Sequence, residues 1–99
     1  MKISIDIGTK HLGWCIFDEN DEIFMFGVDD IRKSNKCDMI RSYATNINEL
    51  LNTGHSNYNF QELLIEQQNF KSSGNIIVQT ILICWCLHKK VQYTLFSPN

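Results

Sequence analysis

Two acidic residues, Asp6 and Glu66, lie inside otherwise apolar segments that have the character of β-strands. Asp6 belongs to the stretch KISIDIGTKHLGW at residues 2–14, and Glu66 belongs to LLIEQQ at residues 63–68. An isolated acid at the end of a strand often only faces solvent. Two such acids on strands predicted to be neighbours instead favour a shared chemical role.

That role follows from the distance at which paired strands hold their side chains. Parallel pairing of the two segments would place Asp6 and Glu66 about 5 Å apart. Two carboxylates this close repel each other in a partly dry site, so they need a proton or a cation between them. Ligands that offer only oxygen favour Mg²⁺ or Mn²⁺ over zinc. Such a site can hold the attacking water and the leaving oxygen of a phosphodiester.

The elements that must position these acids follow from the periodicity of the apolar residues. Ile3, Ile5 and Ile7 alternate with polar positions as in a strand, and residues 8–10 form a turn. Further strands are predicted at 12–18, 23–28, 63–68 and 91–96, and helices at 37–53 and 75–88. The first three strands should form an antiparallel meander, and the later strands should join in parallel through helices. The predicted fold is α/β with the order β-β-β-α-β-α-β.

Several details of these elements can be tested against the structure. Gly54 should stop the first helix, and residues 55–59 should form a loop. Ser72 or Ser73 should cap the second helix. The nearly continuous apolar run at 63–68 predicts a strand buried on both faces. The aromatic residues on strands are predicted to be core residues, namely Trp14, Phe17, Phe24, Phe26, Tyr93 and Phe96.

Composition sets the class of the protein. The chain has 99 residues, 43% of them hydrophobic, with a net charge of −2. We therefore expect a single globular domain over residues 1–99 rather than disorder. No secretory leader or membrane span is predicted, because the N-terminus enters a strand directly and the longest apolar run is short. The net charge does not by itself indicate a nucleic-acid binder.

The four cysteines, Cys15, Cys37, Cys84 and Cys86, match no compact disulfide framework. They predict a reduced, intracellular protein in which the thiols are buried. Cys84, Cys86 and His88 could suggest a metal site. On a helix, however, positions i and i+2 point about 200° apart, so these side chains should not converge on one ion.

Together these residues suggest a family. The segments IDIGTKHLGWCIFD and LLIEQQ, followed by an apolar helix and a strand that ends in SP, resemble the RuvC-type Holliday junction resolvases. The most similar branch is that of poxviruses, other large DNA viruses and fungal mitochondria. The resemblance implies a ribonuclease H-like fold, whose core has the order predicted above.

The resemblance also implies roles for individual residues. Asp6 and Glu66 match metal-binding catalytic acids, which implies Mg²⁺ or Mn²⁺ as the cofactor. The residues that match positions beside the DNA backbone are Thr9, Lys10, Gln67, Gln68 and Lys71. The implied function is a metal-dependent endonuclease that resolves four-way junctions in DNA recombination and repair. A viral resolvase would act in the cytoplasm or nucleus of its host.

One departure from the family pattern leaves alternatives open. Resolvases of this type carry two more acids on a helix after the last strand, whereas this sequence ends at Asn99. We therefore expect an incomplete acidic site and a missing final helix. A noncatalytic module for junction binding or dimerisation is the first alternative. A fragment of an actin-like ATPase or sugar kinase is the second.

The family acts as dimers, and the predicted helix at 75–88 is apolar on nearly every side. We expect its outer face to pack against a second copy of the chain or against the missing C-terminal segment.

Overall fold

The computed structural model describes residues 1–32, 38–69 and 71–97, and within them the predicted order of elements is confirmed. Cys37 lies outside these ranges. The five strands are β1 (Lys2–Asp6), β2 (His11–Phe17), β3 (Ile23–Asp30), β4 (Glu62–Glu66) and β5 (Gln92–Phe96). The two helices are α1 (Met39–Tyr58) and α2 (Ser73–Lys89). None of the described helices is both long and apolar enough to cross a membrane.

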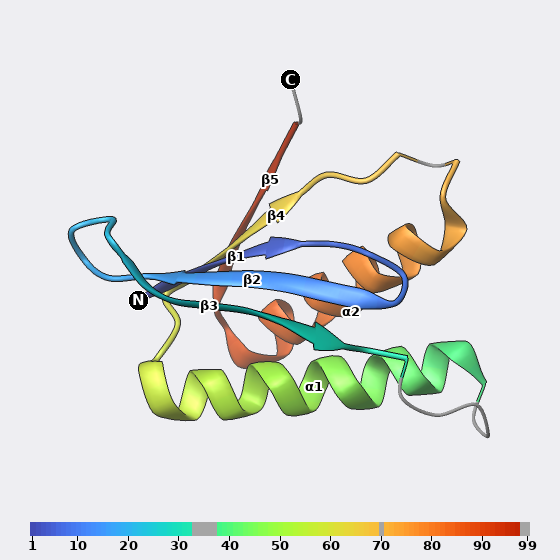
Figure 1. Ribbon diagram of the computed structural model, residues 1–99, viewed down its shortest axis with the longest axis horizontal. Helices are drawn as coiled ribbons and strands as arrows, with labels where there is room; N and C mark the ends of the chain where they lie inside the picture. Colours follow the sequence, from blue (N-terminus) through green and yellow to red (C-terminus); the bar gives the residue numbers. More distant parts are fainter. Residues whose placement is uncertain (33–37, 70, 98–99) are drawn as a thin grey trace.

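The strands form one mixed sheet in the order β3-β2-β1-β4-β5 (Figure 1). β1 pairs antiparallel with β2, and β2 pairs antiparallel with β3. β4 is parallel to both β1 and β5. The antiparallel meander and the parallel additions are therefore as predicted, and β1 and β4 are direct neighbours.

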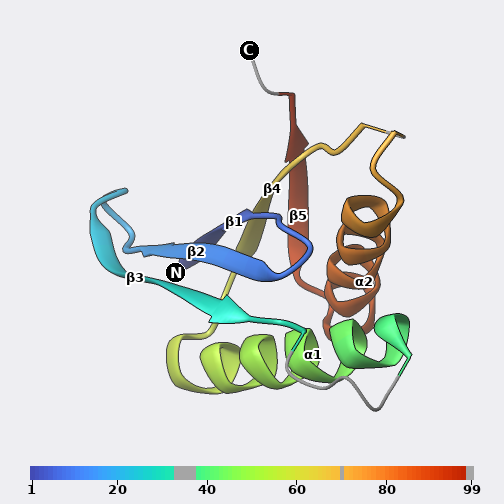
Figure 2. The same cartoon turned by 45° about the vertical axis from the view of Figure 1, so that its right-hand side comes forward.

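Both helices cover the same face of the sheet (Figure 2). Strand residues alternate between the two faces, so Ile3 and Ile5 of β1 and Leu63 and Ile65 of β4 point into one core. The helices supply the other half of this core, chiefly through Tyr43, Ile47, Leu51, Val78, Leu82 and Trp85. We call the opposite side of the sheet the open face. Its central residues are Ser4, Asp6, Gly13, Cys15, Leu64 and Glu66.

The prediction that β4 is buried on both faces was wrong. Leu63 and Ile65 are fully buried, but Leu64 and Glu66 are only half-buried. The nearly continuous apolar run at 63–68 predicts cover on both sides, whereas the described elements cover only one.

The prediction that the strand aromatics are core residues was also largely wrong. Phe26 is 76% exposed, Phe24 50%, Phe96 41% and Tyr93 37%, while Trp14 and Phe17 are half-buried. All four exposed rings lie on the edge strands β3 and β5, where a side chain has neighbours on fewer sides.

Gly54 does not stop α1, which continues to Tyr58 and ends at Asn59 in the left-handed conformation. Residues 55–58, predicted as loop, are therefore helical. A tertiary contact explains why position 54 is a glycine. A Cβ there would lie 2.7 Å from the ring of Phe60. Gly54 lets the buried Phe60 side chain approach the helix backbone.

Helix α2 begins two residues before the predicted start at residue 75, with Ser72 at the N-cap position but without a side-chain capping bond. The prediction that its thiols are buried holds for Cys86, while Cys84 is exposed. Burial raises the pKa of the Cys86 thiol to about 12.

We expect these two thiols to differ in reactivity, because the thiolate is the nucleophile. Iodoacetamide at pH 8 should modify Cys84 at least tenfold faster than Cys86 in the folded protein. Fragment-ion mass spectrometry of the peptide that contains both would measure this. The two rates should converge in urea, and equal rates in the folded protein would contradict the buried position of Cys86.

The turn between β1 and β2 depends on Gly8. A Cβ at this position would lie 2.6 Å from the backbone carbonyl oxygen of His11, which cannot move without moving the turn. Gly8→Ala should therefore lower the free energy of unfolding by about 1–3 kcal/mol in a urea titration. Gly13→Ala is the matched control, since its nearest non-neighbouring atom would lie 3.4 Å away. Equal losses in the two variants would contradict this account of the turn.

Candidate metal and nucleic-acid site

Asp6 and Glu66 lie side by side at the ends of the two central strands. The parallel register pairs Ile5 with Ile65, and each acid is the next residue along its strand. Neighbouring strands are about 4.8 Å apart, so the backbones of the two acids lie at about the spacing from which the sequence-based distance was inferred. Because Ile5 and Ile65 point into the core, Asp6 and Glu66 both project from the open face.

The partners of the acids distinguish this pair from a third acid on the same face. Glu62, at the start of β4, accepts a hydrogen bond of 2.6 Å from the Thr94 hydroxyl and lies 3.9 Å from the Lys2 ammonium. Within the described residues, neither the Asp6 nor the Glu66 carboxylate has a hydrogen bond or ion pair. Their oxygen atoms are thus available to a cation or to another ligand.

The surface beside Asp6 is hollow because its neighbour on β2 is Gly13. Ser4, Gly13 and Cys15 help to line a shallow depression of about 260 Å³ that includes Asp6. Asp6 is exposed and Glu66 is half-buried. A ligand can therefore approach the acid pair from the open face.

The turn after Asp6 is fixed by two contacts to the helices. The Tyr43 hydroxyl of α1 donates a hydrogen bond of 2.7 Å to the Thr9 carbonyl oxygen. The Thr9 side chain lies so close to Gly74 of α2 that a Cβ there would be 2.7 Å from the Thr9 methyl. The sequence carried no signal for this bond between Tyr43 and the turn.

The segment after Glu66 is fixed by the amide of Gln68. Its nitrogen donates to the Glu66 carbonyl oxygen at 2.7 Å, and its oxygen accepts from Asn75 at 3.0 Å. The backbone N–H of Gln68 donates to the Gln79 side chain at 2.7 Å. Gln68 thus ties the end of β4 to α2, and this structural role was not foreseen.

The structure brings the other sequence-predicted residues to the same end of the sheet, where β1 and β4 terminate. Thr9 and Lys10 follow β1, while Gln67 and Lys71 follow β4, and all four are exposed. Both strands run toward the right-hand side of Figure 1, where these two loops lie. The contact between Thr9 and Gly74 shows that the two loops adjoin. Gln68 is half-buried with its amide engaged, so it is less available to a ligand than the other four residues.

The pair of acids fits a single hydrated divalent ion. Mg²⁺ is usually bound through one or two carboxylates and keeps several waters. Two unpaired carboxylates on adjacent strand ends match that requirement. No cluster of three or more His, Cys, Asp or Glu side chains suited to a metal occurs among the described residues.

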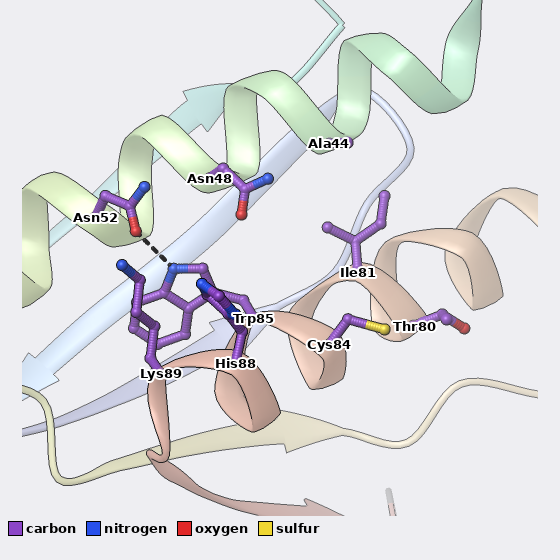
Figure 3. Close-up of a pocket in the computed structure, with 9 residues that line it drawn as sticks. All are labelled: Ala44, Asn48, Asn52, Thr80, Ile81, Cys84, Trp85, His88 and Lys89. Atoms are coloured by element: carbon purple, nitrogen blue, oxygen red, sulfur yellow. Dashed lines mark hydrogen bonds between the residues drawn. The ribbon is translucent and has the colours of Figure 1, made fainter.

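A separate pocket lies between α1 and α2 (Figure 3). It measures about 540 Å³ and is lined by helix residues that include Asn48, Asn52, Cys84 and His88. The Trp85 indole N–H donates to Asn52 at 2.8 Å and holds the two helices together across it. None of its lining residues comes from a strand, so this pocket is separate from the acid pair.

Comparison with solved structures identifies proteins that have a similar fold. No family model matches the chain, and no curated protein matches it by sequence. Among solved structures, Thermus thermophilus RuvC in complex with a Holliday junction has a TM-score of 0.76 at 12% identity. The fowlpox virus resolvase bound to Holliday junction DNA has a TM-score of 0.72 at 17% identity. The yeast mitochondrial Holliday junction resolvase has a TM-score of 0.65 at 20% identity.

These matches cover nearly all of this chain but only part of each resolvase. They cover 99%, 100% and 98% of this chain but 66%, 62% and 52% of the respective resolvases. The chain therefore spans about half to two-thirds of the length of the structures that it resembles.

The sheet order, the two helices on one face and these neighbours define a ribonuclease H-like α/β domain. More narrowly, the chain has the fold of the RuvC-type Holliday junction resolvases, as the sequence resemblance predicted.

Proposed function

We propose that this chain is a metal-dependent DNA endonuclease domain that acts on four-way junctions. The observation that carries the proposal is the pair of unpaired carboxylates, Asp6 and Glu66, at the adjacent ends of β1 and β4. The fold shared with three resolvases supports this proposal, and two of those structures contain Holliday junction DNA.

In this proposal Asp6 and Glu66 hold one Mg²⁺ or Mn²⁺ on the open face. The bound ion supplies charge neutralisation and a water of lowered pKa for attack on the phosphodiester. Gly13 leaves room beside Asp6 for a phosphate group. Thr9, Lys10, Gln67 and Lys71 surround the site and contact the DNA backbone, where the two lysines neutralise phosphate charge.

The bonds of Tyr43 and Gln68 serve the same site indirectly. Tyr43 holds the turn that follows Asp6, and Gln68 holds the backbone of Glu66. Both are positioning residues, because they keep the two carboxylates at a fixed separation while a ligand binds.

A labelled synthetic four-way junction would test the proposal directly. The protein should shift the junction on a native gel in Ca²⁺ and nick it in Mg²⁺ or Mn²⁺. EDTA should prevent nicking, and a linear duplex of the same sequence should be bound at least tenfold more weakly. Absence of both binding and nicking on the junction would overturn the proposal.

A noncatalytic junction-binding module is the second candidate, favoured by the lack of a third acid near Asp6 and Glu66 among the described residues. It predicts binding in the same gel without nicks in any metal. It also predicts that Asp6→Asn leaves junction affinity unchanged.

We also propose that the domain works as a homodimer in a reducing intracellular compartment, in DNA recombination or repair. A two-fold dimer matches a four-way junction, which presents equivalent strands in pairs.

A further inference from the structure

The pocket between α1 and α2 has the size of a small-molecule binding site and takes no part in the proposed nuclease function (Figure 3). Its volume of about 540 Å³ lies within the range of roughly 300–1,000 Å³ that is typical of such sites. Exposed polar side chains from both helices line it, chiefly Asn48 and Asn52 of α1 and Cys84, His88 and Lys89 of α2. The pocket therefore combines a thiol, an imidazole, an ammonium group and two amides.

The charge and the hydrogen-bond donors of the pocket favour an anionic ligand. Lys89 supplies an ammonium group, and no Asp or Glu is among the described residues that line the pocket. The Oδ1 atom of Asn52 accepts the Trp85 indole N–H at 2.8 Å, so the NH₂ group of Asn52 is left to donate to a ligand. Figure 3 shows Lys89 and Asn52 toward the same end of the pocket. Together they offer a place for a carboxylate.

The thiol of Cys84 is the reactive group of the pocket. Cys84 is free and exposed, whereas Cys86 is buried and is not among the lining residues. His88 follows Cys84 by one helical turn, and side chains at positions i and i+4 of a helix are neighbours, with Cβ atoms about 5–6 Å apart. An adjacent base of this kind can take up the proton of a thiol that acts as a nucleophile.

We propose that this pocket binds a small anionic disulfide of peptide type, which Cys84 then captures as a mixed disulfide. The proposal goes beyond the nuclease function and does not depend on it. A carboxylate of the ligand binds Lys89 and the NH₂ group of Asn52, and a peptide amide of the ligand binds Asn48. The pocket is long enough to hold these groups while the ligand sulfur reaches Cys84.

The capture step is a thiol–disulfide exchange. The Cys84 sulfur attacks one sulfur of the ligand, so a new S–S bond forms and the S–S bond of the ligand breaks. His88 receives the proton of the Cys84 thiol, and the second half of the ligand leaves as a thiolate. The ligand disulfide is itself the oxidant, since one half remains bound to Cys84 and the other half is reduced.

Glutathione disulfide is a suitable probe, because it carries carboxylates, peptide amides and one S–S bond. Fragment-ion mass spectrometry would measure the rate of modification at Cys84, divided by the rate in the same chain unfolded in urea. On this scale we expect glutathione disulfide to react at least tenfold faster than cystamine, a cationic disulfide. The rate should saturate with glutathione disulfide, because binding precedes reaction, and should rise in proportion to concentration with neutral iodoacetamide.

Lys89→Gln and Lys90→Gln form a matched pair of variants. The two lysines are adjacent and exposed, but only Lys89 lines the pocket. Lys89→Gln should slow the reaction with glutathione disulfide at least fivefold, because it removes a charge-assisted bond to the ligand. Lys90→Gln should leave this rate within twofold. The rate with iodoacetamide should stay within twofold in both variants, which separates ligand recognition from the reactivity of the thiol itself.

Three results would overturn the proposal. These are equal scaled rates for glutathione disulfide and cystamine, a rate that does not saturate with glutathione disulfide, and equal slowing in Lys89→Gln and Lys90→Gln. Because the readouts need neither metal nor DNA, their failure is distinguishable from failure of the proposed nuclease.

Discussion

Glu66→Gln should reduce metal-dependent nicking of a four-way junction by at least about 100-fold, whereas Glu62→Gln should leave it within about twofold. Both substitutions remove one negative charge from the open face of β4. Only Glu66 lies beside Asp6 and has a carboxylate without a partner among the described side chains, while Glu62 bonds to Thr94. Changes to residues that merely support a metal ligand cost 10- to 100-fold, so loss of a ligand should cost at least as much. Asp6→Asn should behave as Glu66→Gln does.

A second readout separates metal binding from chemistry. A bound ion stabilises the folded state in proportion to its affinity and concentration, so millimolar Mg²⁺ or Mn²⁺ should raise the melting temperature of the natural sequence. This rise should vanish in Asp6→Asn and Glu66→Gln and persist in Glu62→Gln. Equal responses to the metal in Glu62→Gln and Glu66→Gln would remove the basis for assigning the site to the ends of β1 and β4.

Leu82→Ala should lower the free energy of unfolding by about 2–5 kcal/mol, because Leu82 is fully buried between α2 and the sheet. Leu87→Ala provides the control on the same helix, since Leu87 is 65% exposed. Its effect should stay within about 0.5 kcal/mol. Urea titrations of both variants would measure the difference.

The size of the Leu82 effect matters because domains of this length are marginally stable. A loss of several kcal/mol removes a large share of the 5–15 kcal/mol that typically separates folded and unfolded states. Similar losses in Leu82→Ala and Leu87→Ala would mean that α2 does not pack on the sheet through the face described above.

The sequence predicted the parts of the fold that depend on local periodicity. The alternation of residues in β1 predicted that Asp6 projects from the face of the sheet opposite to that of Ile3 and Ile5. The predicted parallel pairing of β1 with β4 put Glu66 next to Asp6. These inferences succeed because side-chain direction along a strand is fixed by the backbone. The positions of all seven elements followed from the same kind of pattern.

The errors arose where tertiary contacts override local pattern. Gly54 has the character of a helix terminator, yet it lies inside α1 because the Phe60 ring needs the space. Phe26 has the character of a core residue, yet its strand lies at the edge of the sheet. Neither a close approach between distant segments nor the position of a strand within a sheet is encoded in a short window of residues.

The candidate site was likewise predictable only where local pattern determines it. Its two carboxylates were predicted from strand positions, while the bonds that fix them were not. Tyr43 reaches the Thr9 carbonyl across 34 positions of the chain, and Gln68 was assigned to DNA although its amide is engaged within the protein. Such bonds depend on how the helices sit against the sheet.

β1 and β4 are neighbours in the sheet but far apart in the sequence. Asp6 and Glu66 can therefore become neighbours only after both strands have been synthesised. β2 and β3 are joined by a short turn and can pair as soon as both have left the ribosome. The pairing of Ile5 with Ile65 instead requires closure of a loop of about 60 residues, which is slow and entropically costly. A nascent chain therefore carries Asp6 without a neighbouring carboxylate until Glu66 has emerged, and only then can the two acids come together.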